Sequence, residues 1–259
     1  MTANRLDHRI RRMPSEVFDT LPPNVGRVLS GFVEDARHTF AEDLRAVVLY
    51  GSAVDGQLRP MSDVNTLLVL SQFEQGKADQ FSEPLRLAQT AIRLRTMFLL
   101  ESEVRPAMAS FAVKFGDIIR RHRVLFGADP FANLSITRSD SIVRLKQTLL
   151  NLALRLREAY VARGLREEQL VRVIADSAGP LRSCAATLLE LEGVVAPSPK
   201  EALRQAAGLL PEGDVHADDV WRISEAREKQ VLPAGVPRTT LFHLIELTHS
   251  LWARAENLT

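Results

Sequence analysis

Apolar residues in the first part of the chain change from a helical spacing to two short continuous runs. In residues 25–44 they recur every three or four positions, which predicts an amphipathic helix. Residues 46–50 and 64–70 contain short runs of mostly branched apolar side chains beside turn-forming residues, a pattern typical of buried strands. The sequence therefore predicts a helix and then two strands separated by a loop.

The next segment returns to helical spacing over residues 83–99, and residues 110–116 are then interpreted as a third strand. The order helix, strand, loop, strand, helix, strand is that of a small α/β unit with a mixed or parallel sheet. We expect the three predicted strands to lie adjacent in this sheet.

After about residue 138 the sequence shows no further strand signal. A helix is expected from Ser139 or Asp140 to Gly164, and another over residues 166–193 with a break at Gly179-Pro180. Further helices are expected after the capping box that begins at Ser198, and over residues 216–230 and 238–257. The predicted organisation is given by three ranges: a lead-in at 1–23, a first domain at 24–132, and an α-helical domain at 138–259.

Composition and charge restrict the partners. The net charge of +1 favours neither nucleic acid nor an anionic membrane surface as a partner. No apolar run is long enough to span a bilayer, and the first residues do not resemble a signal peptide. Cys184 has no second cysteine to pair with, which fits a reducing compartment, so we expect a cytoplasmic location.

The segment with the clearest chemistry joins the first two predicted strands. Gly51 and Ser52 follow the first strand, and Ser62, Asp63 and Asn65 stand where the second begins. Residues 63 and 65 are two apart, so on a strand they share a face. Glycine lets a phosphate approach the backbone, hydroxyl groups bind its oxygens, and acidic groups hold the metal that accompanies a nucleotide. An ordinary strand-turn-strand with an aspartate in its loop remains the alternative.

This segment resembles the nucleotidyltransferase superfamily, in which Gly-Ser precedes an Asp-x-Asp pair by about ten residues. Gly51, Ser52, Gly56, Ser62 and Asp63 match that pattern, but the second acid is replaced by Asn65. The resemblance implies an α+β fold: a nucleotidyltransferase-like mixed sheet with flanking helices, followed by an all-α helical domain. It also implies that Asp63 is a metal ligand and that Gly51, Ser52 and Ser62 bind nucleotide or phosphate.

A second segment, residues 111–131, is similar to one found in bacterial nucleotidyltransferase-like proteins. The matching residues are His122, Arg123, Val124, Leu125, Gly127, Asp129, Pro130 and Phe131. The resemblance implies a third catalytic carboxylate on the third strand, where this chain has Lys114. Asp117 would face away from Lys114 on a regular strand, so it is expected to cap a helix that begins at Ile118.

The replaced acids decide the expected function. Magnesium prefers anionic oxygen ligands, so Asn65 is a weak ligand and Lys114 repels the metal. We expect Mg²⁺ binding to be weak, nucleoside triphosphate or phosphate binding to be retained, and nucleotidyl transfer to be impaired or absent, with Asp63, Asn65 and Lys114 at the catalytic positions. Two alternatives stay open: an active metal-dependent transferase that moves AMP or another nucleotide to a small-molecule, protein or RNA acceptor, and a non-enzymatic interaction scaffold.

Near the end of the chain, Arg238 and His243 fit an Arg-x4-His pattern. This pair resembles one used by helical ribonuclease-like domains of the HEPN group. Arginine and histidine fall at this spacing by chance as well, and His243 then serves as an ordinary polar residue on a helix face.

Overall fold

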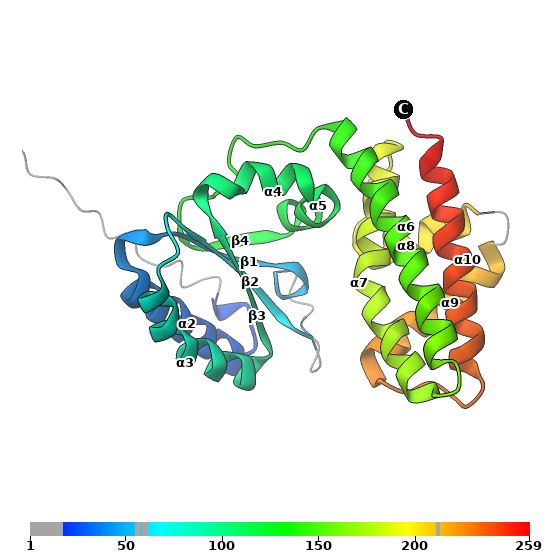
Figure 1. Ribbon diagram of the computed structural model, residues 1–259, viewed down its shortest axis with the longest axis horizontal. Coiled ribbons are helices and arrows are strands. Elements are labelled where there is room, and N and C mark those ends of the chain that lie inside the picture. The colour runs from blue at the N-terminus through cyan, green and yellow to red at the C-terminus, as the bar shows by residue number, and fades with distance from the viewer. Residues whose placement is uncertain (1–17, 55–57, 59–61, 211–212) are drawn as a thin grey trace, which may run out of the picture. The chain divides into compact units, whose positions relative to one another are not determined.

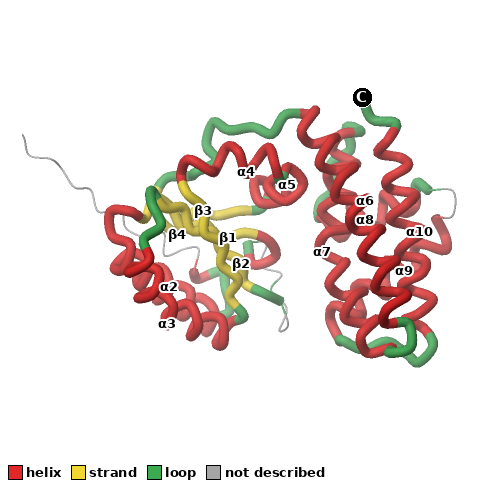
Figure 2. Tube along the Cα trace, in the orientation of Figure 1, coloured by secondary structure: helices red, strands yellow, loops and turns green. Residues whose placement is uncertain are grey.

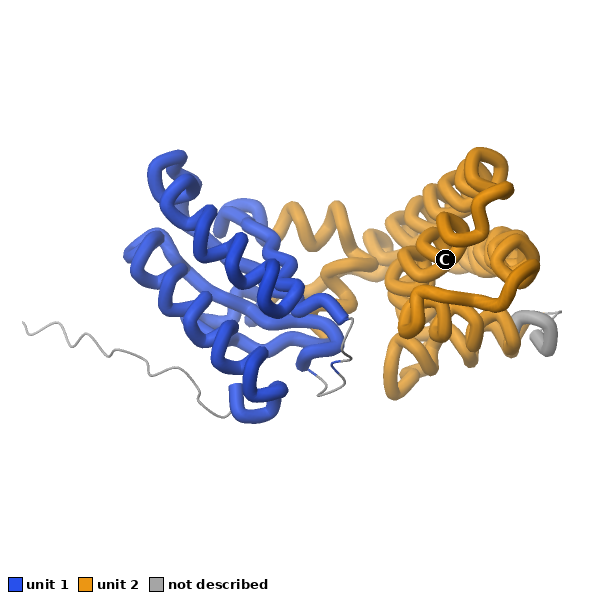
Figure 3. Tube along the Cα trace, turned by 90° about the horizontal axis from the view of Figure 1, so that it is seen from below, with its two compact units in different colours: residues 1–104, 121–133 blue, residues 105–120, 134–259 orange. Residues whose placement is uncertain are grey.

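The computed structural model describes residues 18–54, 58, 62–210 and 213–259. They form two compact units, which Figure 3 shows in different colours. The first unit contains the chain up to Val104 together with Arg121–Asn133, and the second contains Arg105–Arg120 together with Leu134–Thr259. The chain thus enters the second unit, returns to the first, and enters the second again.

The first unit is built on a mixed sheet (Figures 1 and 2). Among the described residues four strands form it, in the order β3-β2-β1-β4. Their bounds are β1 (Leu44–Tyr50), β2 (Val64–Leu70), β3 (Leu94–Leu100) and β4 (His122–Gly127). Strand β1 runs antiparallel to both β2 and β4, whereas β2 and β3 are parallel. The two parallel strands are joined by a helical crossover, as parallel pairing requires.

Two helices, α2 (Pro23–Phe40) and α3 (Gln75–Ile92), pack on one face of the sheet (Figure 1). Their apolar faces meet in a cluster of aromatic rings, with the centroid of Phe81 at 5.2 Å from that of Phe32 and 5.0 Å from that of Phe40. Buried aromatic pairs of this kind add to the free energy gained from burying their surface. The layer of α2 and α3 therefore leaves the strand ends to position polar groups.

A buried carboxylate ties the beginning of β1 to the end of β2. Asp43 accepts hydrogen bonds from the Ser71 hydroxyl at 2.6 Å and the Gln72 amide at 3.2 Å, and it pairs with the Lys77 ammonium group. The Ser71 amide also donates to the Asp43 carbonyl. The hydrogen bond from Lys77, followed by those from Ser71 and Gln72, lowers the pKa of Asp43 to about 2.

The sheet differs from the prediction in its last two strands. The first two predicted strands are confirmed as β1 and β2, but residues 110–116 are helical and lie in the second unit. The strand beside β2 is instead β3, which the sequence assigned to the end of a helix over 83–99. Strand β4 was missed, because it begins with the polar pair His122-Arg123 and only Leu125 is fully buried.

The second unit is helical, and the described residues from Arg138 onward contain no strand, as predicted. Its helices are α4 (Val104–Ser110, whose first residue closes the first unit), α5 (Ala112–Arg120), α6 (Arg138–Arg163), α7 (Glu167–Leu191), α8 (Pro199–Gly208), α9 (Gly213–Lys229) and α10 (Val236–Glu256). Leucine and alanine dominate the core between them. The Ser198 side chain caps α8 as expected, whereas α6 is capped by Thr137. The predicted break at Gly179-Pro180 is wrong, because α7 continues through Pro180.

Residues 105–120 are the main difference in domain organisation. They were predicted to belong to the domain that contains the sheet. In the structure α5 packs on α6 and α7, and Val113 lies in the core of the helical unit. An ion pair between Arg120 and Glu190 and a 3.3 Å hydrogen bond from Arg144 to the Ala109 carbonyl hold the segment to these helices.

Candidate functional site

The polar residues of the first resemblance gather at one edge of the sheet. Tyr50 at the end of β1 pairs with Asn65 of β2 on one side and with His122 of β4 on the other. Val64 of β2 pairs with Leu94 of β3. The end of β1 and the beginnings of the other three strands therefore meet here, and the loops that join them carry the candidate residues.

Gly51 begins the turn after β1 with φ of +80°, a conformation that strongly favours glycine. Its amide donates to the Arg121 carbonyl at 3.0 Å, which fixes the turn to the start of β4. A Cβ at this position would lie 3.6 Å from Nδ2 of Asn65, so the asparagine side chain lies beside the glycine backbone. The structure thus brings Gly51 and Asn65 together, with half-buried Ser52 next in the turn.

Asp63 is paired with two arginines. Its Oδ1 lies 3.1 Å from Nε of Arg93, and its Oδ2 lies 3.8 Å from Nε of Arg95. Arg95 stands directly beside Asn65 in the parallel pairing of β2 and β3. The carboxylate that the resemblance assigns to a metal is therefore neutralised by two guanidinium groups.

Arg93 occupies an uncommon backbone conformation. It ends α3 in the left-handed region at φ of +54°, where a side chain is unfavourable and glycine is usual. Its carbonyl accepts a 3.3 Å hydrogen bond from the Val64 amide, which joins it to the start of β2. An arginine in this position directs a charged side chain at Asp63 at a cost in backbone energy.

These residues do not fit a two-metal site. Asp63 offers one carboxylate that already has cationic partners, Asn65 offers a neutral amide, and Arg95 adds a positive charge. Within the described part of the chain there is no group of three or more histidine, cysteine, aspartate or glutamate side chains placed to hold a metal ion. The donor set suits an anionic ligand better than a divalent cation.

Arg93 and Arg95 were not predicted as site residues, because the spacing of their segment indicated a helix. The sequence does contain a short apolar run, residues 97–100, which begins two residues after Arg95 and indicates a strand. Ser62 is half-buried and directly precedes Asp63. Gly56 lies outside the described residues.

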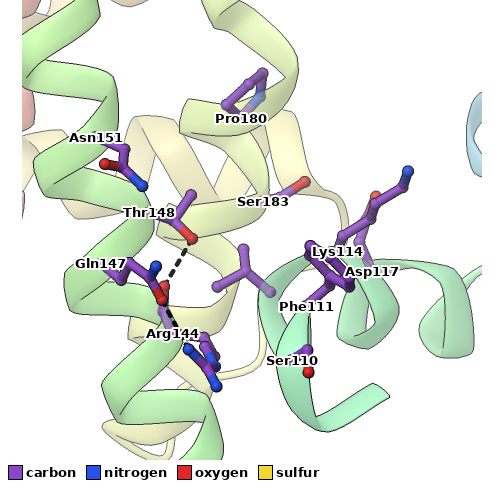
Figure 4. Close-up of a pocket in the computed structure, with 11 residues that line it drawn as sticks. Ser110, Phe111, Lys114, Asp117, Arg144, Gln147, Thr148, Asn151, Pro180 and Ser183 are labelled. Atoms are coloured by element: carbon purple, nitrogen blue, oxygen red, sulfur yellow. Dashed lines mark hydrogen bonds between the residues drawn. The ribbon is translucent and has the colours of Figure 1, made fainter. Parts of the chain in front are cut away.

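Lys114 does not lie on a strand and Asp117 does not cap a helix that begins at Ile118, so both predictions are wrong. Both lie on α5 in the helical unit, and Asp117 lies within this helix rather than at its start. They line a groove of about 610 Å³ between α5, α6 and α7 (Figure 4). Polar side chains of Gln147, Asn151 and Ser183 line the same groove. It is a separate feature of the helical unit.

The residues of the second resemblance have a structural role in the first unit. Asp129 accepts a 2.9 Å hydrogen bond from the Phe131 amide and lies 3.3 Å from Nε2 of His122, whose ring meets Phe131 edge-on. A Cβ on Gly127 would lie 2.0 Å from the Arg45 carbonyl oxygen, so only glycine fits where β4 ends against β1. This motif anchors β4 in the sheet.

Arg238 and His243 make different contacts within the helical unit. Arg238 donates to the Tyr160 hydroxyl at 3.1 Å and lies over its ring. Nδ1 of His243 lies 3.0 Å from Oδ2 of Asp219, which is fully buried. The buried carboxylate orients the His243 ring, and Arg238 packs on α6.

Comparison with known proteins adds evidence for the fold. No protein-family model matches the sequence, and no curated protein matches it. The structure is similar to that of spectinomycin adenyltransferase AAD(9) from Enterococcus faecialis, solved with ATP and spectinomycin, with a TM-score of 0.62 and 13% sequence identity over 86% of this chain and 98% of that one. The chain has the nucleotidyltransferase fold. Its sheet and helical units thus match a nucleotidyltransferase-like mixed sheet followed by a helical C-terminal region.

Among the described residues, no helix is both long and apolar enough to cross a bilayer.

Proposed function

We propose that the sheet edge of this nucleotidyltransferase fold binds the phosphates of a nucleoside triphosphate without a divalent metal, and that nucleotidyl transfer is impaired or absent. The observation that supports this proposal is the pairing of Asp63 with Arg93 and Arg95. Among the described residues of this edge, the two cations outnumber the one carboxylate, so the local charge around Asp63 is positive.

Arginine is suited to this role because its planar fork donates two parallel hydrogen bonds to phosphate oxygens. The side chains of Arg93 and Arg95 are 48% and 70% exposed, so a ligand reaches both. A bound triphosphate competes with Asp63 for them, and it brings more negative charge than the single carboxylate. We expect the Ser52 and Ser62 hydroxyl groups to donate to the same ligand.

The similar adenyltransferase was solved with ATP, so ATP is the first nucleotide to test. The test is calorimetric titration of ATP in EDTA and again in excess Mg²⁺. Binding is expected in EDTA, with no gain from Mg²⁺. The variants Arg93→Ala and Arg95→Ala should each weaken binding about tenfold or more, because each loses a charge-assisted contact.

Arg86→Ala is the matched control. Arg86 lies on α3 in the same unit, is exposed, and pairs with Glu83 at 2.6 Å, so it represents an ordinary surface ion pair. Its loss should leave ATP affinity unchanged. ATP binding that requires Mg²⁺, together with transfer of AMP to an acceptor, would instead establish an active transferase. Absence of any nucleotide binding would favour an interaction scaffold.

A further inference from the structure

Helix α6 carries an apolar stripe on the side that faces away from the core of its unit. Four of its apolar side chains are well exposed, at 55, 44, 54 and 84%: Val143, Leu150, Leu154 and Val161. With 3.6 residues per turn these four fall within about 40° around the helix. The buried residues of α6, including Leu145, Leu149 and Leu156, lie on the opposite side. The stripe runs for roughly 27 Å along the helix.

Exposed apolar residues that occur singly need no explanation, but a straight line of them marks an interaction surface. Two polar residues, Gln147 and Arg157, lie on the same line as the four apolar ones. Together the six positions follow one another in alternating steps of four and three residues: 143, 147, 150, 154, 157 and 161. This is the spacing of a coiled-coil seam. A helix with this spacing fits a second helix laid along it.

The stripe is complementary to itself when two copies of α6 run antiparallel. With a two-fold axis at the level of Leu152, Val143 faces Val161 of the second copy and Leu150 faces Leu154. The two polar positions of the seam also meet, because Gln147 faces Arg157, and the amide oxygen accepts a hydrogen bond from the guanidinium group. All layers of the seam are therefore matched by one symmetry operation, as a closed dimer requires.

The charge within the seam favours the same direction. In the antiparallel arrangement Arg157 of each copy faces the neutral Gln147 of the other. In a parallel arrangement each seam position would meet its own copy, so Arg157 would face Arg157. Like charges in register destabilise a helix pair.

We infer that the protein forms a two-fold symmetric dimer through α6, with the stripe of each copy packed antiparallel on that of the other. Sedimentation analysis of the full chain should show a monomer-dimer equilibrium that shifts to dimer as concentration rises to about 100 µM. The double variant Leu150→Lys with Leu154→Lys should weaken the dimer at least tenfold, because four lysines would be brought together.

The matched control is Val195→Lys with Val231→Lys. These two residues are 88% and 64% exposed, belong to the same unit and lie outside α6, so the charge change is the same. The dimer should persist in this control. Circular dichroism should show unchanged folding in both variants, since all four side chains are exposed.

Cross-linking tests the direction without relying on those variants. Cys184 is buried and its pKa is raised to about 12 by burial, so an introduced thiol reacts alone. A mixture of Val143→Cys and Val161→Cys proteins should form a mixed disulfide, whereas neither should link to itself. Self-linking of Val143→Cys would indicate a parallel dimer and overturn the inference.

Two further results would overturn it. One is a wild-type protein that stays monomeric at about 100 µM. The other is a dimer that tolerates the two lysines in the stripe. If the monomer also protects Val161→Cys from maleimide, the stripe is covered by another part of its own chain.

Discussion

Arg93 is a residue at which the stability of the fold and the binding of a ligand favour different side chains. Its left-handed backbone costs about 1 kcal/mol relative to glycine, and its partly exposed pair with Asp63 returns about 0.2–1 kcal/mol. Stability alone would therefore favour glycine at this helix end. The arginine is explained if its guanidinium group serves a ligand.

The first prediction follows from this conflict. Arg93→Gly should leave the free energy of unfolding unchanged or raise it by up to about 1 kcal/mol, because the strain disappears with the ion pair. The same change should weaken ATP binding. Urea denaturation and calorimetry on the purified variant measure the two effects. A clear loss of stability with intact ATP affinity would contradict the functional account of Arg93.

The second prediction concerns the metal. Asn65 and Arg95 are neighbours across β2 and β3, so the double change Asn65→Asp with Arg95→Glu adds two carboxylates beside Asp63. We expect Mn²⁺ affinity to rise about tenfold or more, since a neutral ligand and a cation are both replaced by anions. Each single change should give less, because the three groups share one ion.

Titration of Mn²⁺ in the presence of a nonhydrolysable triphosphate measures this gain. Lys114→Glu in place of Arg95→Glu is the comparison, since Lys114 lies on α5 in the other unit. An equal gain from Lys114→Glu would show that Arg95 is not the residue that keeps the ion from Asp63.

At the scale of elements, Asp43 links the start of β1 to the end of β2. Its pKa of about 2 lies below the ordinary aspartate value of about 3.9, so the contact stabilises the fold fully above pH about 4. This contribution is lost as the pH falls toward 2, where the carboxylate becomes protonated in the folded protein. Asp43→Asn removes the charge at every pH.

The third prediction is that the free energies of unfolding of wild type and Asp43→Asn converge at low pH. The stability advantage of wild type over Asp43→Asn should be constant between about pH 5 and 7 and should shrink between about pH 4 and 2. Guanidinium denaturation of both proteins across this range measures it, and general acid effects cancel in the difference. An advantage that stays constant down to pH 2 would show that the Asp43 charge does not hold the strands.

The individual elements also show how much of the fold could be predicted from the sequence. Runs such as Val47-Val48-Leu49 identified β1, because all three residues are fully buried, and the Gly51 turn with Asp63 could be placed from spacing. Residues 110–116 were misread because a segment of seven residues has too few periods to separate a strand from a helix. β3 was hidden because it begins two residues after α3 ends, with Arg93 where a glycine would have marked the boundary.

The candidate site was predictable only in part, for a related reason. Gly51, Ser52, Asp63 and Asn65 lie on β1, β2 and their connection, which local patterns identify. Of the arginines that pair with Asp63, Arg95 lies on β3 and Arg93 directly precedes it, about thirty residues away, and the parallel pairing of β2 with β3 brings them there. No local pattern reports such a pairing.

At the scale of the whole molecule, the helical unit is discontinuous. Helix α5 is separated from α6 by β4 and a loop, yet Val113 lies in the core between the helices. The fourth prediction is that cleavage in the loop 128–137 leaves the two fragments associated. Size exclusion after limited proteolysis should show one peak, and separation should require denaturant. Fragments that separate in native buffer would contradict the assignment of α5 to the helical core.

The same discontinuity sets the order in which the protein is completed during synthesis. The sheet receives its last strand when residue 127 leaves the ribosome, but α5 has by then emerged without the helices that cover it. Its Val113 side chain lies in the core of the helical unit and is fully covered only after α7, which ends at Leu191, has been made. A nascent chain between these lengths exposes an apolar helix, and this is the window in which a chaperone would bind it.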